Sequence, residues 1–164
     1  MILRAACRED LRAMMTWFPD ADSCRNWGGP EFRFPFTEQS FVEDARFPLL
    51  PSYVGTDGNS VLGFGQYYLR AGRCHVSRLA VAPAQRGQGL GAGLLAALVD
   101  MGARALGVRQ CSLFVSAGNE RAARLYRRLG FAETDYPDAQ AALAGSLYLV
   151  AQVERVLRRE SRPA

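Results

Sequence analysis

The sequence predicts an α/β fold in which a mixed β-sheet carries helices on both faces. Two patterns support this class: a run of strands joined by tight turns in the first half of the chain, and an alternation of strands and helices in the second half. The chain has 164 residues, of which 49% are hydrophobic, and a chain of this size can bury a core without disulfides or metals. We therefore expect a single domain over residues 1–164 that ends in a polar tail at 155–164.

The first third of the chain predicts one strand and two helices. Residues 2–6 are expected to form a short strand, and Arg8–Phe18 a helix, because its apolar residues recur at helical spacing. Residues 19–36 are rich in glycine, proline and aromatic residues and are expected to be irregular. Thr37 is a candidate N-cap for a second helix that runs to about Phe47, since its hydroxyl can accept a hydrogen bond from the first helical turn.

The middle of the chain predicts a meander of three strands. They cover Ser52–Thr56, Val61–Arg70 and Cys74–Val81. The sequence Asp57–Ser60 between the first two is typical of a hairpin turn. The third strand ends in the continuously apolar segment Leu79–Val81, as a central strand buried on both faces would.

The second half of the chain alternates between strands and helices. Helices are indicated by apolar residues on one side and by a glycine that follows the last turn. The expected elements are a helix from Gly89 to about Leu106, a strand at Gln110–Ser116, a helix at Asn119–Leu129, strands at Phe131–Tyr136 and Ser146–Val153, and a connector at 137–145.

The basic residues exclude several kinds of enzyme. All twenty are arginine, with none lysine, and the net charge is +4. Without lysine the protein cannot form a Schiff base with pyridoxal phosphate, and it lacks the lysine of nucleotide-binding phosphate loops and of kinases. Arginine clusters at Arg124–Arg128 and Arg155–Arg162 could bind nucleic acid, but solvated helix faces explain them better, and we expect no nucleic-acid partner.

Metal sites, disulfides and membrane segments are not expected. No two of the four cysteines have C-x-x-C spacing, and His75 is the only histidine. The N-terminus becomes charged too early for a signal peptide, and no apolar run approaches the roughly 20 residues of a membrane span. We therefore expect a cytoplasmic protein.

The most informative segment passes from the strand ending at Val81 through the glycine-rich turn Arg86–Gly91 into a helix. The first amides of a helix have no intrahelical partner and lie at the positive end of its dipole. Glycines let a ligand approach this backbone closely, and Arg86 adds a fixed charge. The segment therefore predicts an anion site suited to a phosphate or pyrophosphate, although tight strand–helix packing would also favour glycines there.

Two motifs resemble those of a known family. The first is Leu79-x-Val81-x-Pro83 followed by Arg86-Gly87-Gln88-Gly89-Leu90-Gly91, and the second is N-x-x-A-x-x-L-Y-x-x-x-G-F over Asn119–Phe131. Together they are similar to the signatures of the GCN5-related N-acetyltransferase (GNAT) family, firmly over 61–136 and only in layout over 1–60. The resemblance implies a mostly antiparallel central sheet in which the fourth and fifth strands splay apart.

The resemblance also implies acetyl-CoA as cofactor and assigns residues to it. The backbone of the fourth strand would bond the pantetheine arm, the amides of the turn would hold the pyrophosphate, and the second motif would contact the pantetheine region and the sulfur. The implied cofactor-binding residues are Leu79, Ala80, Val81, Arg86, Gly87, Gln88, Gly89, Leu90, Gly91, Asn119 and Tyr126.

Two residues are candidates for proton transfer. In the family the tyrosine at the position of Tyr126 usually protonates the departing thiolate, although a helix tyrosine can also be packed in a core. His75 lies four residues before Leu79, where related enzymes often carry a general base acting directly or through water. An ordinary strand histidine would be the alternative, and an amine of low pKa would need no strong base.

These features predict an N-acetyltransferase that moves an acetyl group from acetyl-CoA to a primary amine in a ternary complex. The acceptor would be a small molecule or a peptide, and aromatic residues such as Trp27, Phe32 and Tyr67 could line its site, unless they only pack the core. The alternative is a non-catalytic acyl-CoA-binding sensor on the same fold. A homodimer is also expected from the resemblance.

Overall fold

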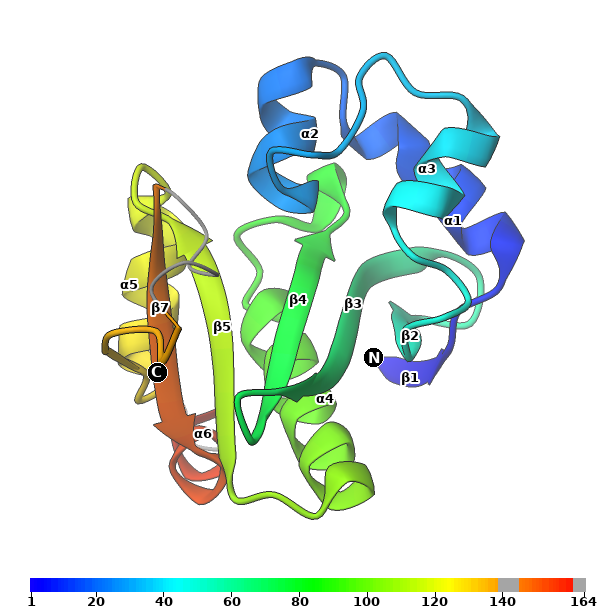
Figure 1. The fold of residues 1–164 in the computed structure, drawn as a ribbon. Coiled ribbons are helices and arrows are strands. Elements are labelled where there is room, and N and C mark those ends of the chain that lie inside the picture. Colours follow the sequence, from blue (N-terminus) through cyan, green and yellow to red (C-terminus); the bar gives the residue numbers. More distant parts are fainter. Residues whose placement is uncertain (139–144, 161–164) are drawn as a thin grey trace. The chain divides into compact units, whose positions relative to one another are not determined.

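The computed structural model describes residues 1–138 and 145–160, and their strands form a seven-stranded mixed sheet (Figure 1). The spatial order of the strands is β1-β2-β3-β4-β5-β7-β6. Pairing is antiparallel for β1·β2, β2·β3, β5·β7 and β6·β7, and parallel for β4·β5. The strands are β1 (Ile2–Ala5), β2 (Ser52–Thr56), β3 (Val61–Arg70), β4 (Arg73–Val81), β5 (Gln110–Ser116), β6 (Ala132–Glu133) and β7 (Ser146–Gln152).

The chain divides into two compact units. Unit 1 consists of Met1–Gln66 and Arg78–Leu94, and unit 2 consists of Tyr67–Ser77 and Leu95–Ala164. The strands β3 and β4 and the helix α4 each contribute residues to both units. The helices are α1 (Arg8–Met14), α2 (Ala21–Gly28), α3 (Glu38–Asp44), α4 (Leu90–Leu106), α5 (Glu120–Arg128) and α6 (Val153–Glu160), with short 3-10 turns η1 (Met15–Trp17) and η2 (Pro83–Gln85).

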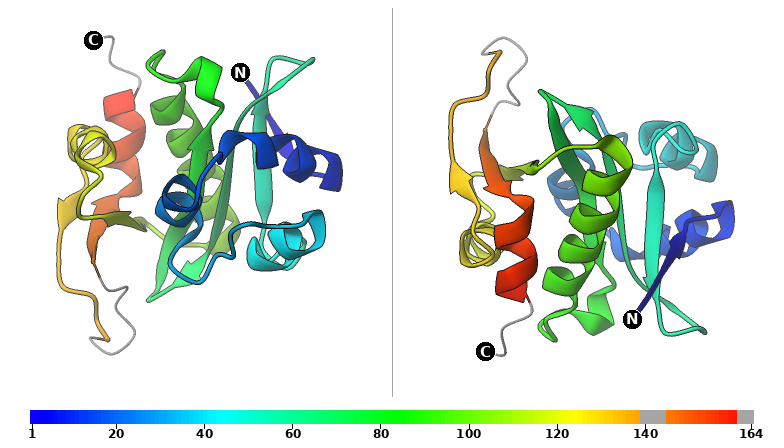
Figure 2. Two further views of the ribbon diagram at one scale, coloured as in Figure 1. Left: turned by 90° about the horizontal axis from the view of Figure 1, so that it is seen from above. Right: turned by 90° about the horizontal axis from the view of Figure 1, so that it is seen from below.

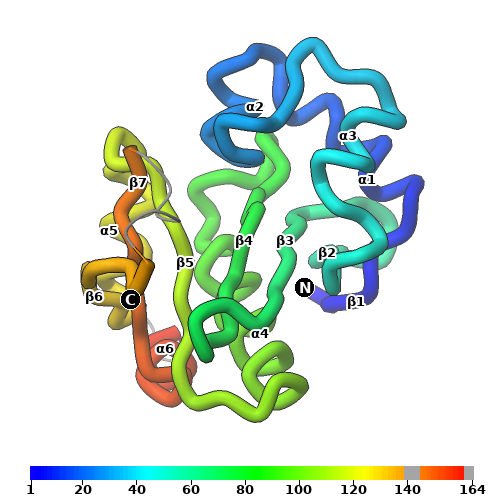
Figure 3. The backbone as a smooth tube through the Cα atoms, in the orientation of Figure 1, coloured from blue at the N-terminus to red at the C-terminus, as the bar shows by residue number. Residues whose placement is uncertain are grey.

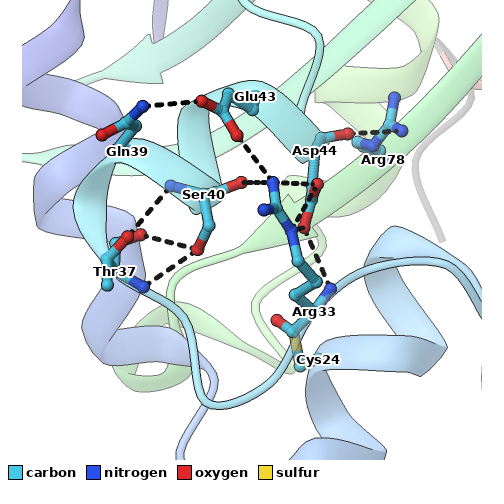
Figure 4. Close-up of polar contacts among 8 residues, drawn as sticks. All are labelled: Cys24, Arg33, Thr37, Gln39, Ser40, Glu43, Asp44 and Arg78. Carbon is cyan, nitrogen blue, oxygen red and sulfur yellow. Dashed lines mark hydrogen bonds and ion pairs between the residues drawn. The ribbon is translucent and has the colours of Figure 1, made fainter.

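Unit 1 has an aromatic core that is packed against α1, α2 and α3. Figure 3 shows the course of the backbone through these three helices. Leu11, Met14 and Phe41 are fully buried there, and Phe64 of β3 is buried with them. The helix α3 begins as predicted at the N-cap Thr37, whose hydroxyl accepts a hydrogen bond from the Ser40 amide at 3.1 Å (Figure 4).

The expectation that residues 19–36 are irregular is wrong, because α2 lies within them. The Asp20 carboxylate accepts a hydrogen bond from the Ser23 amide at 2.7 Å and so caps the helix at its start. The helix ends at Gly28, and Gly29 follows with a φ of 99°. The capping pair Asp20-x-x-Ser23 was the signal for this helix, and the aromatic composition obscured it.

In unit 2, α5 and α6 run beside each other (Figure 2), and an Arg159 Nη1 donates to the Arg128 carbonyl at 3.0 Å. The expected polar tail is wrong over its described part, because α6 continues to Glu160 and buries Val156 completely. The rest of that expected tail, 161–164, lies outside the described residues. The expected strand Phe131–Tyr136 is only the two-residue β6, and most of the expected connector 137–145 also lies outside the described residues.

Candidate active site

The strand β4 pairs with β5 only at its beginning. Among the described residues, this parallel ladder joins Cys74 to Cys111 and His75 to Ser112. The strand β5 instead pairs along its whole length with β7, from Gln110–Gln152 to Ser116–Ser146. Leu79–Val81 take no part in this described ladder, and the splaying of the fourth and fifth strands stays a prediction.

In unit 1 the end of β4 leads directly into the glycine-rich turn. The Ala82 amide donates to the Leu62 carbonyl of β3 at 2.9 Å, and the side chain of Arg86 donates to the Val81 carbonyl at 3.2 Å. These bonds hold the turn against the strand that precedes it. Residues Leu79, Ala80 and Val81 are half-buried.

The turn itself is exposed from Arg86 to Gly89, and α4 begins at Leu90. Gly87 and Gly89 have φ values of 86° and 80°, a region that side chains other than glycine rarely adopt. A Cβ added at Gly89 would meet no atom within 4 Å, so its backbone conformation, not crowding, requires glycine there. An accessible turn with helix-start amides fits a phosphate group, which is what the sequence predicts for Arg86–Gly91.

Gln88 and Gly91 complete the turn. The Gln88 side chain donates to the Ala84 carbonyl at 3.4 Å and thus remains folded over the 3-10 turn η2. Gly91 is half-buried in the first turn of α4, and the Ala92 amide beside it donates to the Gly89 carbonyl at 3.0 Å. The amides that precede Ala92 at the helix start have no carbonyl one turn earlier in the helix to bond.

In unit 2 the second motif forms α5. Asn119 is its N-cap, and the Asn119 side chain accepts a hydrogen bond from the Ala122 amide at 3.1 Å. Tyr126 is only 9% exposed, and its ring lies 6.0 Å from that of Phe131. Its hydroxyl makes no hydrogen bond to another described residue, and burial raises the pKa of Tyr126 to about 12. The phenol is therefore protonated at neutral pH.

His75, also in unit 2, is 2% exposed. Its Nδ1 lies 2.9 Å from the Ser112 Oγ, and its ring packs 5.2 Å from Tyr68 and 5.4 Å from Phe114. Burial, with a smaller contribution from the charge of Arg70, lowers the pKa of His75 to about 3. The imidazole is therefore neutral at pH 7. Its role as general base stays a prediction, and burial opposes this role because a histidine that accepts a proton becomes charged.

Of the three aromatic residues predicted for the acceptor site, two lie in unit 1 and one lies in unit 2. Trp27 and Phe32 pack in the core of unit 1 with ring centroids 5.2 Å apart, and Phe32 is 3% exposed. Tyr67 belongs to unit 2, where its ring lies against Gly102 of α4. Their contact with a substrate stays a prediction.

Two residues with defined positions were missed in the sequence. Ser112 orients His75, and Arg78 of β4 has a left-handed backbone with a φ of 48°. A serine in a strand and an arginine in a strand carry no motif that would have distinguished them. Over the described residues, no three His, Cys, Asp or Glu side chains gather where a metal ion could be held, and none of the helices is both long and apolar enough to cross a membrane.

The family of the protein follows from its sequence match. Residues 21–131 match the sequence profile of the acetyltransferase (GNAT) family. The chain belongs to this family. The match covers more than half of the chain and contains both motifs, the turn at Arg86–Gly91 and the helix α5. The resemblance given by the two motifs is thereby confirmed.

Known GNAT proteins and folds resemble the chain to different extents. The uncharacterized N-acetyltransferase YycN of Bacillus subtilis (strain 168) is 50% identical over 50 residues, which are 30% of this chain and 31% of that protein. The structure of AAC(6')-Ib in complex with ribostamycin and coenzyme A is 22% identical with a TM-score of 0.74, covering 99% of this chain and 98% of that one. A putative acetyltransferase, yncA from Salmonella typhimurium with its cofactor acetyl-CoA, is 22% identical with a TM-score of 0.65, covering 93% and 94%. At these identities the two structures show a shared fold.

Proposed function

We propose that this protein is an acetyl-CoA-dependent N-acetyltransferase that acts on a primary amine by direct transfer in a ternary complex. The observation that carries the proposal is the turn Arg86–Gly91, which is exposed from Arg86 to Gly89 and offers helix-start amides and an arginine shortly after β4. Membership of the GNAT family supports it, as do fold neighbours that hold acetyl-CoA or coenzyme A. The acceptor is a small molecule or a peptide that carries the amine.

The residues fit the cofactor by their chemistry. The amides of Arg86–Gly91 and the guanidinium of Arg86 would bind the pyrophosphate, and the peptide groups of Leu79–Val81 in the same unit would bond the pantetheine arm. Asn119 keeps the contact with the pantetheine region that the family resemblance implies. When bound, acetyl-CoA supplies the thioester whose acetyl group passes to the amine. The protonated hydroxyl of Tyr126, which bonds no other described residue, would donate its proton to the sulfur of the leaving group.

The acceptor amine must lose a proton before or during its attack. A neutral His75 could accept this proton directly or through water, with Ser112 holding its ring in place. An amine that is already neutral at the working pH would need neither. Two further expectations, a cytoplasmic location and a homodimer, stay predictions.

Binding of acetyl-CoA by calorimetry tests the turn. We expect the wild-type protein to bind acetyl-CoA, and Gly89→Val to bind it at least tenfold more weakly, because valine strains a backbone with a φ of 80°. Gly58→Val is the matched control, since Gly58 also has a positive φ of 104° and open space around it but lies in the β2–β3 hairpin. Equal loss of binding in both variants, or in neither, would remove the turn from the cofactor site.

A further inference from the structure

The backbone of β4 takes an unusual conformation directly before Leu79. Three described residues other than glycine have a positive φ, and Arg78, with a φ of 48°, is the one among them that lies within a strand. An L-amino acid avoids this region because its Cβ crowds the following carbonyl oxygen. Surrounding contacts must therefore hold Arg78 in place.

Both the main chain and the side chain of Arg78 are held by other segments of unit 1. The indole Nε1 of Trp27 donates to the Arg78 carbonyl at 2.8 Å. The two terminal nitrogens of Arg78 donate to the Gln66 Oε1 at 3.0 Å and to the Asp44 carbonyl at 3.0 Å, the second contact being visible in Figure 4. Residues from α2, α3 and β3 thus converge on one residue of β4, with Trp27 bonding its peptide carbonyl and Gln66 and Asp44 bonding its side chain.

These partners are themselves fixed. The indole of Trp27 stacks on Phe18 at 4.4 Å and on Phe41 at 5.5 Å. Gln66 is fully buried and donates to the Ala45 carbonyl at 2.8 Å and to the Ser52 Oγ at 2.9 Å. The hydrogen-bond donors and acceptors that reach Arg78 therefore have little freedom to move.

Asp44 is held in turn by the side chain of Arg33. An Arg33 Nη2 lies 2.7 Å from the Asp44 Oδ1, and the Arg33 amide donates to the other carboxylate oxygen at 3.0 Å (Figure 4). The guanidinium of Arg33 keeps the pKa of Asp44 below its usual range. The end of α3, and with it the Asp44 carbonyl that binds Arg78, is anchored by this pair.

We propose that Trp27 and Arg78 are positioning residues for acetyl transfer. By fixing the left-handed backbone immediately before Leu79–Val81, they set the direction in which this segment presents its peptide groups to the acetyl thioester. The inference rests on the proposed function. It gives Trp27 a role different from the substrate contact expected from the sequence, because its indole N–H is committed to the Arg78 carbonyl.

The substitution Trp27→Phe tests this role, since it keeps an aromatic ring and removes the N–H. We expect kcat to fall at least fivefold and the KM for acetyl-CoA to rise by a smaller factor, because Leu79–Val81 loosens while the pyrophosphate-binding turn at Arg86–Gly91 is untouched. Phe36→Leu is the control, because the Phe36 ring packs on Phe34 and Phe41 of the same core and, among the described residues, does not stack on Trp27. Phe36→Leu should lower the melting temperature about as much as Trp27→Phe does. Its kcat, measured well below that temperature, should stay within twofold of the wild type.

Amide hydrogen exchange gives a second readout that does not depend on activity. Exchange in a peptide covering Arg78–Val81 should accelerate at least tenfold in Trp27→Phe and not in Phe36→Leu. An unchanged kcat with unchanged exchange in Trp27→Phe would overturn the positioning role and leave the proposed function intact. Failure of the wild-type protein to acetylate any amine would instead overturn the proposed function, and this inference with it.

Discussion

His75 and Tyr126 are both shielded from solvent, and burial moves their pKa values in opposite directions. It lowers the pKa of His75 to about 3 and raises that of Tyr126 to about 12. Both side chains are therefore uncharged at pH 7. A neutral phenol carries the proton that a general acid needs, whereas a buried imidazole resists the charge that a general base acquires.

The same burial makes the stability of the protein depend on pH. Histidine in an unfolded chain takes up a proton near pH 6.5, whereas folded His75 stays neutral down to about pH 3. The contribution of His75 to the free energy of unfolding is complete above pH 6.5 and is lost progressively as the pH falls from 6.5 toward 3. By pH 4.5 the loss is about 2–3 kcal/mol.

Urea unfolding of His75→Gln measures this contribution. The variant has no imidazole to titrate, so its free energy of unfolding should fall by about 2–3 kcal/mol less than that of the wild type between pH 7 and pH 4.5. Asp10, whose pKa Arg4 lowers to about 2, adds the same acid sensitivity to both proteins. Parallel pH curves for the two proteins would show that His75 is not buried as described.

Among the elements, α6 depends on one apolar contact face. Val156 is fully buried, and a Cβ added at Gly130 would come within 2.8 Å of the Arg155 Cγ, so the helix lies close over the end of α5. The spacing of Val153, Val156 and Leu157 was the available sequence signal, but five charged residues between 154 and 160 masked it.

Truncation of this contact should destabilise the protein. We expect Val156→Ala to lower the free energy of unfolding by about 2 kcal/mol, from the lost burial of two methyl groups and the cavity that remains. The control Arg158→Ala removes only an exposed ion pair with Glu154 and should change stability little. Chemical denaturation measures the free energy of unfolding of both variants. An equal loss of stability in the two would mean that α6 is not packed through Val156.

At the scale of the whole molecule, sequence patterns predicted most of the sheet. The strands at Ser52–Thr56, Val61–Arg70 and Gln110–Ser116 occur at their expected bounds, because β-branched and apolar runs there are bounded by turn residues. Helix α2 was missed because its stability comes from a capping pair and from the packing of Trp27, neither of which has a periodic pattern.

The candidate site could be predicted from the sequence only where the backbone conformation requires a particular residue type. The turn Arg86–Gly91 needs glycine at positive φ, so its chemistry is visible in the sequence. The surroundings of His75 and Arg78 depend on residues distant in the chain, such as Ser112 and Trp27, and a single sequence does not show which of them meet. The burial that sets the His75 pKa is equally a product of the folded state.

The most direct test of the proposed activity follows thiol release from acetyl-CoA with a panel of primary amines, and identifies the acetylated amine by mass spectrometry. We predict release that requires an amine, and a kcat at least tenfold lower in Tyr126→Phe with acetyl-CoA binding unchanged within twofold. Tight acetyl-CoA binding without release for any amine would point to a non-catalytic sensor and contradict the account. A Tyr126→Phe variant as fast as the wild type would remove the assigned general acid.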